Sequence, residues 1–286
     1  MKIKLAFITD EATQDLAEAI TFAKEHGLQG VELRSVADTP IDRIDHDTLR
    51  KYKNMLDEAK LTVCNLASSF FKCLPSQAEP EYDKLVRLCD AADILECDTI
   101  RGFVFFAEGE PKITDEMIAR FAPAVEILRN RNKQLLLEAD PSVNTTNHAA
   151  LASFLDRLNC PEVGAIYDPG NDIYDRYREV PYPDGYNSVK HHIRHVHIKD
   201  AVRNENDEPE CVCIGTGWVD YPGLIRALSA DGYDGWMSLE THYRLGAAIS
   251  EELMTRPGGA AFSEGGMGAT AESAAALRKL VEENCV

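Results

Sequence analysis

The feature that most constrains the fold of this chain is a regular alternation of short apolar runs with longer amphipathic segments. Eight runs have the length and the β-branched or apolar content of buried strands. They are IKLAFIT (3–9), GVELRS (30–35), LTVCNLAS (61–68), TIRGFVFF (99–106), QLLLEAD (134–140), VGAIYD (163–168), HVHIKD (195–200) and WMSLET (236–241). Between them, apolar residues at three-to-four spacing predict helices at 15–26, 47–60, 81–95, 114–130, 148–158 and 221–230.

Strands and helices that alternate in series predict a parallel sheet, either closed into a barrel or open and doubly wound. An open sheet of this kind typically carries a phosphate-binding glycine loop after its first strand. Here the first run is followed by Thr9-Asp10-Glu11-Ala12, without a GxGxxG pattern. The 286 residues also suit one barrel, whose usual length is about 250 residues. We therefore expect an α/β fold, a single (β/α)8 barrel, with residues 1–286 as one domain.

The residues between these elements predict several boundaries. Asp15 and Thr114 stand where helix N-caps are expected, and Gly27 and Gly232 follow helical segments where a left-handed residue is common. The Gly- and Ala-rich stretch 255–270 is interpreted as a mobile loop before a last helix, TAESAAALRKLVEEN. The polar stretch 203–210 is interpreted as a flexible lid or a solvated loop.

The net charge restricts the partners. Lys and Arg number 30 against 48 Asp and Glu, which gives −18 at pH 7, and no basic stripe interrupts this balance. A strongly acidic protein repels phosphate backbones, so neither nucleic acid nor an anionic membrane is expected as a partner. The eight cysteines are scattered, and the close pair Cys211 and Cys213 lacks zinc-site spacing. Since no signal-length or membrane-spanning apolar run is found, the cytoplasm is the expected location.

Polar residues at the carboxyl ends of four successive strands indicate where the chemistry lies. Glu138 ends the fifth apolar run, Asp168 ends the sixth, His197 lies in the seventh and Glu240 follows the eighth. In a parallel barrel, the carboxyl ends of the strands converge on the ligand-binding face. The sequence therefore predicts that three carboxylates and one imidazole meet at one rim.

Three carboxylates crowded together repel one another, and a divalent cation removes that repulsion. An oxygen and nitrogen ligand set without thiolate favours Mn²⁺, Mg²⁺, Co²⁺ or Zn²⁺ in an open, catalytic site. Taken alone, Asp168 has the simpler interpretation of a helix cap, and His197 that of a hydrogen-bonded core histidine. Glu138 and Glu240 are harder to explain structurally, because each follows an almost wholly apolar strand.

Further polar and aromatic residues near the same rim are candidates for substrate binding. They are Lys199, His242, Asn171, Arg101, Glu32 and Trp218. Three of them have a structural alternative: Arg101 opens its strand and suits an ion pair at the opposite face of the barrel, Glu32 can pair with Arg34, and Trp218 can anchor a loop. His195 is interpreted as a core or solvent-facing histidine.

Five motifs between about residues 134 and 243 carry a family resemblance: LLLEAD, YDPGN, HVHIKD, GTGWVDYPGLIRAL and GYDGWMSLETHY. Their order and spacing resemble the xylose isomerase-like TIM barrel family, the sugar phosphate isomerase/epimerase group. This group includes ketose 3-epimerases, inosose dehydratases, hydroxypyruvate isomerases and endonuclease IV. The resemblance implies that Glu138, Asp168, His197 and Glu240 bind one divalent metal ion, with Mn²⁺ first among the candidates, and that Glu138 and Glu240 are catalytic.

The function implied is a divalent-metal-dependent isomerase or epimerase acting on a ketose or related keto-polyol. The two glutamates would transfer a proton through an enediolate. The same residues allow a second outcome, a dehydratase of an inosose-like keto-polyol, and a third, a barrel that keeps the metal only for binding or structure. Endonuclease IV chemistry is disfavoured by the acidic charge and by the lack of additional strand-end histidines. The expected partner is a small carbohydrate, and the resemblance is compatible with a homo-oligomer.

Overall fold

The computed structural model describes residues 3–246, 249–255 and 257–285. Eight parallel strands form its central sheet, in the order β1-β12-β9-β8-β7-β6-β5-β2. They are β1 (Lys4–Phe7), β2 (Gly30–Leu33), β5 (Thr62–Phe70), β6 (Thr99–Gly102), β7 (Gln134–Glu138), β8 (Val163–Tyr167), β9 (Ile193–Ile198) and β12 (Trp236–Leu239). Each lies within one of the eight predicted runs or overlaps it, so the predicted strands are confirmed.

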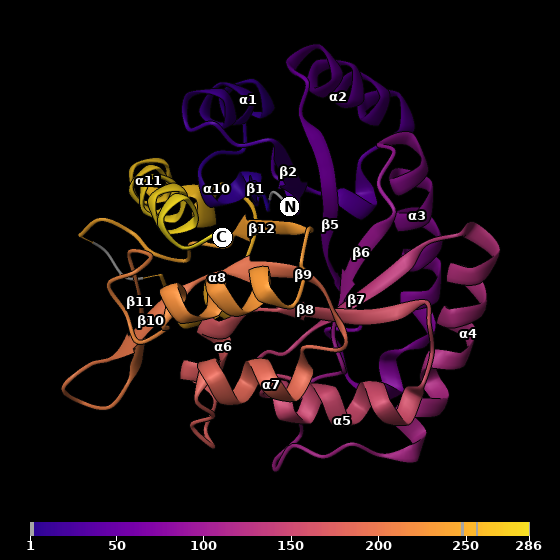
Figure 1. The fold of residues 1–286 in the computed structure, drawn as a ribbon. Helices are drawn as coiled ribbons and strands as arrows, with labels where there is room; N and C mark the ends of the chain where they lie inside the picture. The colour runs from indigo at the N-terminus through magenta and orange to yellow at the C-terminus, as the bar shows by residue number, and fades with distance from the viewer. Residues whose placement is uncertain (1–2, 247–248, 256, 286) are drawn as a thin grey trace.

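The sheet is nearly closed into a barrel. Its first and last strands in sequence are neighbours, since Lys4 to Phe7 of β1 pair in register with Trp236 to Leu239 of β12. The remaining gap, between β1 and β2, is spanned by a single parallel bridge from Ile8 to Glu32. Figure 1 shows the helices on the outside of this ring of strands. The prediction of a (β/α)8 barrel is confirmed, and the doubly wound alternative is excluded.

The helices that cover the barrel follow the predicted segments within two residues at either end. They are α1 (Leu16–Glu25), α2 (His46–Ala59), α3 (Glu79–Ile94), α4 (Asp115–Arg131), α5 (His148–Leu158) and α8 (Tyr221–Ala230). Asp15 caps α1 by accepting from the backbone N–H groups of Ala17 and Glu18, and Thr114 caps α4 in the same way. Across the described residues, no helix is both long enough and apolar enough to cross a membrane.

Four short helical segments were not predicted. They are α6 (Pro169–Tyr174), α7 (Tyr186–Val189), α9 (Glu251–Thr255) and α10 (Ala260–Ser263). Single helical turns named η1 (Thr9–Glu11), η2 (Ile41–Arg43), η3 (Pro75–Gln77) and η4 (Pro181–Gly185) complete the connections. Of these, η1 and α6 begin directly after a barrel strand, so they place backbone and side chains at the rim where the site was predicted.

The strands are apolar because both of their faces are covered. In β7 the three consecutive leucines at 135, 136 and 137 are all buried, together with Glu138. One face of such a strand packs against helices, and the other fills the barrel interior, so a continuous apolar run replaces the alternating pattern of a half-exposed strand. Glu138 therefore begins in a strand whose other buried side chains are apolar.

Two predicted loops have more structure than expected. The stretch 203–210 forms part of an antiparallel hairpin of β10 (Asp200–Arg203) and β11 (Pro209–Val212), and a smaller hairpin joins β3 (Ser35–Val36) to β4 (Thr39–Pro40). The stretch 255–270, expected to be a mobile loop, contains α10 and the start of α11 (Gly266–Asn284), while residue 256 lies outside the described part. Phe262 of α10 is 1% exposed, so this segment packs into the molecule. Ala is the strongest helix former, which explains how a Gly- and Ala-rich stretch can be helical.

Candidate metal and substrate site

The candidate site lies where the parallel strands end. Glu138 is the last residue of β7, Asp168 directly follows β8, His197 is near the end of β9 and Glu240 directly follows β12. A cavity of about 1060 Å³ opens at this rim. The predicted site residues that line it are Arg101, Glu138, Asn171, Lys199, Glu240 and His242.

The four predicted metal ligands come together as the sequence indicates. Glu138, Asp168, His197 and Glu240 each offer a ligand atom within 4.8 Å of those of the other three, and all four side chains are buried. Nδ1 of His197 lies 2.9 Å from Oε1 of Glu138 and 3.5 Å from Oε2 of Glu240. Asp168 also caps α6 by accepting from the backbone N–H of Gly170 at 2.9 Å. It is therefore both a helix cap and a member of the cluster.

Two buried cations hold these carboxylates. Arg101 NH1 contacts Glu138 at 3.0 Å and Glu240 at 2.8 Å. Nζ of Lys199 contacts Asp168 at 2.8 Å and Glu240 at 3.0 Å. Arg101 therefore points toward the rim that holds the candidate site, and its alternative interpretation as an ion pair at the opposite face is wrong. A long side chain starting at the third residue of a four-residue strand can reach the rim from below.

A second group of ion pairs connects the site to η1, the helical turn that contains Asp10 and Glu11. Arg34 NH2 contacts Asp10 and Glu11 at 2.8 Å each, and its NH1 lies 3.3 Å from Glu240. Nδ1 of His242 lies 3.1 Å from Glu11. Asp10 and Glu11 were not predicted as site residues. They directly follow the first apolar run, and that position is the same signal that identified Asp168.

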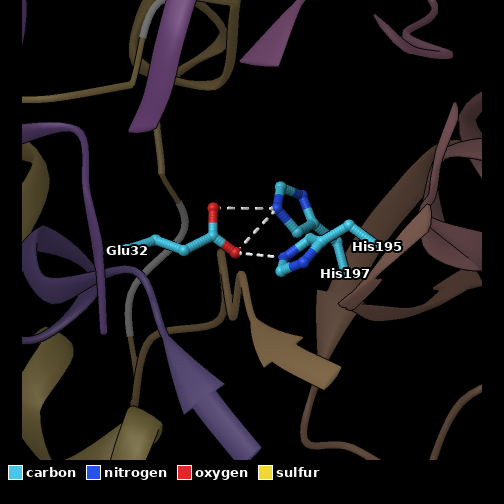
Figure 2. A group of neighbouring side chains, drawn as sticks. All are labelled: Glu32, His195 and His197. Carbon is cyan, nitrogen blue, oxygen red and sulfur yellow. Dashed lines mark hydrogen bonds and ion pairs between the residues drawn. The ribbon is translucent and has the colours of Figure 1, made fainter. Parts of the chain in front are cut away.

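Glu32 does not pair with Arg34, contrary to one sequence-based alternative. Although both residues belong to GVELRS, Glu32 turns toward β9 and contacts His195 and His197, as Figure 2 shows. It also accepts a hydrogen bond of 3.0 Å from Asn65. Glu32 is fully buried and lies outside the lining of the cavity, so the structure places it beneath the candidate metal ligands and away from the position expected of a substrate contact.

The remaining predicted contacts divide into two groups. Asn171 lines the cavity, where its Oδ1 accepts from Lys199 at 3.0 Å and its Nδ2 donates to the carbonyl of Ala139 at 2.8 Å. Trp218 is 59% exposed and lies outside the cavity lining, so the structure does not bring it to the site. Lys72, which pairs with Asp140 at 2.8 Å, lines the cavity but carried no recognisable signal in the sequence.

The connected ion pairs carry a net charge that bears on metal binding. Six buried carboxylates belong to the network: Asp10, Glu11, Glu32, Glu138, Asp168 and Glu240. Four buried cations oppose them: Arg34, Arg101, Lys199 and Arg244. With neutral histidines, two negative charges remain uncompensated among these buried side chains.

The pKa values of Asp168 and His197 are both raised in this network. Burial raises the pKa of Asp168 to about 7, and the neighbouring Glu138 and Glu240 add to that rise against the opposing Lys199. For His197, burial opposes ionisation, but the carboxylates of Glu32 and Glu138 raise its pKa well above the usual value. Both shifts draw protons into the cluster, as expected where negative charge is in excess. One divalent cation supplies the same two positive charges, and the ligand set of carboxylates and an imidazole fits Mg²⁺, Mn²⁺, Co²⁺ or Zn²⁺.

Comparison with known proteins agrees with this architecture. The family model described as "Xylose isomerase-like TIM barrel" matches residues 20–280. A curated inosose dehydratase from Lacticaseibacillus casei is 21% identical over 151 residues, which are 46% of this chain and 50% of the relative. The chain thus spans about half the length of the curated relatives that it matches.

Solved structures share the fold at low identity. A D-allulose 3-epimerase from Methylomonas sp. in complex with D-allulose has a TM-score of 0.74 and 16% identity, with 99% of this chain and 97% of the other covered. A xylose isomerase-like TIM barrel protein from Mycobacterium smegmatis in complex with magnesium has a TM-score of 0.70 and 15% identity, with 99% and 97% covered. Since the family model matches most of the sequence, the chain belongs to the xylose isomerase-like TIM barrel family.

Proposed function

We propose that this protein is a divalent-metal-dependent isomerase or epimerase of a ketose or related keto-polyol. The observation that carries the proposal is the cluster of Glu138, Asp168, His197 and Glu240, whose ligand atoms lie within 4.8 Å of one another. Two of its members, Glu138 and Glu240, also line a cavity of about 1060 Å³, so they can meet a substrate. Among the candidate metals Mn²⁺ is our first choice, because oxygen-rich sites with one imidazole suit it.

In this proposal the two glutamates exchange a proton with the substrate. A bound divalent cation would polarise the substrate carbonyl and so acidify the adjacent C–H bond. One of Glu138 and Glu240, as a carboxylate, removes that proton, and the other returns a proton to the carbon that is to be inverted or reduced. Arg101 and Lys199 contact both sides of this cluster and line the cavity, so they can donate hydrogen bonds to the substrate oxygens.

The second candidate function is dehydration of a keto-polyol, such as an inosose. It begins with the same proton abstraction, but a hydroxyl group β to the carbonyl then leaves as water after taking up a proton. The curated relatives named as inosose dehydratases favour this alternative. His242 and Lys199 line the cavity and are two of the groups that can protonate the leaving oxygen.

One experiment separates the two functions. The Mn²⁺-loaded protein is incubated with keto sugars and inososes in D₂O. Isomerisation or epimerisation places deuterium on the carbon skeleton and conserves the substrate mass apart from that exchange, whereas dehydration gives an absorbing enone with loss of water. Removal of the metal with a chelator is expected to stop either reaction, and a metal-free protein with full activity would contradict the site assignment.

The variant Glu240→Gln tests the role of the glutamates. It keeps the size of the side chain but removes the proton acceptor, so turnover is expected to fall by about 10²- to 10⁴-fold. Glu162→Gln is the matched control, because Glu162 pairs with Arg129 on the outside of the barrel. If Glu240→Gln were as active as the control, the proposed proton transfer would be wrong.

A further inference from the structure

A buried carboxylate beneath the candidate metal ligands has no role in the proposed reaction. Glu32, on β2, is 0% exposed and lies outside the cavity lining. Three side chains contact it. His195 approaches Oε1 through Nε2 at 2.5 Å, Nε2 of His197 lies 3.2 Å from both oxygens, and Asn65 donates to Oε2 at 3.0 Å. Figure 2 shows both imidazoles facing this one carboxylate.

Such a carboxylate is unusual for its position. The interior of a parallel barrel is normally filled by layers of branched apolar side chains. Burial of an ionised carboxylate costs several kcal/mol unless it is paired, and apolar residues at the same place are often equally stable or more so. Stability alone therefore does not explain Glu32, and because it lies outside the cavity lining, substrate contact does not explain it either.

The contacts of His197 indicate what Glu32 does. Nε2 of this imidazole faces Glu32, whereas Nδ1 faces Glu138 and Glu240. An ionised carboxylate accepts hydrogen bonds only, so Nε2 must carry the proton in this contact. Nδ1 lies 2.9 Å from Oε1 of Glu138, so in the metal-free protein Nδ1 shares a proton with that carboxylate. When a cation displaces this proton, the lone pair of Nδ1 points toward the other candidate ligands. A metal-binding histidine commonly donates its second N–H to a carboxylate in this way, which fixes the tautomer and the ring orientation.

We propose that Glu32 is a positioning residue that holds His197 as the Nε2-protonated tautomer, ready to bind a divalent cation through Nδ1. His195 in turn holds Glu32. The two histidines are two positions apart on β9, so their side chains lie on the same face of the strand, with ring centroids 5.3 Å apart. Together with Asn65 on β5, these histidines fix the carboxylate through three side chains from two other strands, β9 and β5. This inference rests on the proposed metal site, and it assigns to Glu32 a role other than substrate binding.

Metal affinity tests the inference without any substrate. In Glu32→Gln the amide can direct an N–H group at His197, which disfavours the Nε2-protonated tautomer. We expect the affinity for Mn²⁺, measured by competition with a chelating dye, to fall by about 10- to 100-fold, the usual effect of losing such a partner. His195→Gln leaves Glu32 bound to His197 and Asn65, so its loss is expected at the lower end, about 10-fold. Glu162→Gln, on the outer surface, is expected to bind as the unaltered protein does.

A second measurement applies even where a variant does not fold. Nitrogen NMR of the unaltered protein, labelled on its histidines, reports which ring nitrogen of His197 is protonated in the metal-free state and after loading with Zn²⁺. The inference requires a protonated Nε2 in both states. A metal bound to Nε2, or a Glu32→Gln protein with unchanged affinity and tautomer, would overturn it.

The two proposals fail in different ways. If the unaltered protein bound no divalent cation, the proposed function would be wrong, while the tautomer of His197 in metal-free protein would still report on Glu32. If the metal bound normally and Glu32→Gln had no effect, only the positioning role would be wrong.

Discussion

Arg101→Met is the substitution through which the charge balance of the site can be measured. Arg101 is 4% exposed, and its NH1 contacts Glu138 at 3.0 Å and Glu240 at 2.8 Å. Its Nε and NH2 donate to the carbonyls of Ser68 and Ala67, both at 3.1 Å. Methionine fills part of the volume but leaves two buried carboxylates and two carbonyls without this donor. Breaking a buried ion pair by removal of one partner costs about 3–5 kcal/mol, so we expect the metal-free protein to lose that much free energy of unfolding.

The same substitution should be less costly when a divalent cation is bound. The variant network has one more uncompensated negative charge, and a cation near Glu138 and Glu240 offsets part of it. Urea denaturation followed by circular dichroism, with and without saturating Mn²⁺, gives both free energies. The expected result is a smaller loss with Mn²⁺ and a Mn²⁺ affinity at least equal to that of the unaltered protein. Equal losses in the two conditions would refute the view that the metal and Arg101 neutralise the same carboxylates.

A surface pair provides the control for this measurement. Arg129 contacts Glu162 at 2.8 Å, and its side chain is 62% exposed. Exposed ion pairs contribute little to stability because water and salt screen them. Arg129→Met is therefore expected to leave the free energy of unfolding unchanged within error, with or without Mn²⁺.

Two further outcomes test the same structure. Burial raises the pKa of Asp168 from 3.8 to about 7, so the folded state binds this proton more tightly than the unfolded state does. The contribution of Asp168 to stability is therefore present below pH 3.8 and is lost as the pH rises toward 7. We expect the difference in unfolding free energy between metal-free unaltered protein and Asp168→Asn to show this slope in urea titrations, and Mn²⁺ to abolish it; a flat difference would contradict the shift. Asp15→Ala removes the cap that accepts from Ala17 and Glu18, and it is expected to lower the free energy of unfolding by about 1 kcal/mol, measured by the same titration; no measurable loss would show that the cap is dispensable.

The fold and the four candidate metal ligands could be predicted because the same β-then-α unit recurs along the chain. Each β-then-α unit has its own apolar run, and the carboxyl ends of parallel strands meet at one rim. The four candidate ligands each lie at or near the carboxyl end of a strand, so the position in the strand was sufficient to predict that they meet. They are Glu138, Asp168, His197 and Glu240. Their roles as metal ligands remain predictions.

The contacts across the barrel could not be predicted in the same way. Arg101 contacts Glu240 at the upper rim and does not stay at the lower face of the barrel. This outcome depends on the length of β6 and on the space inside the barrel, and neither is encoded in a short motif. Glu32 and Arg34 share one face of their strand run, which suggested a mutual pair, but Arg34 pairs with Asp10 of η1 and Glu32 with His197 of β9. These choices follow from tertiary packing rather than from local pattern.

The packing of residues 259–270 against η1 has a consequence for the order of events during synthesis. Oγ of Ser263 donates to the carbonyl of Asp10 at 2.7 Å, and Oγ1 of Thr270 donates to that of Glu11 at 3.3 Å, across 253 and 259 positions of sequence. A Cβ atom on Gly266 would lie 1.9 Å from the carbonyl oxygen of Glu11, so the backbones touch directly. The acids that pair with Arg34 are thus translated long before the segment that supports their turn. A nascent chain on the ribosome can assemble most of the barrel and still lack a completed rim until this late segment emerges and docks.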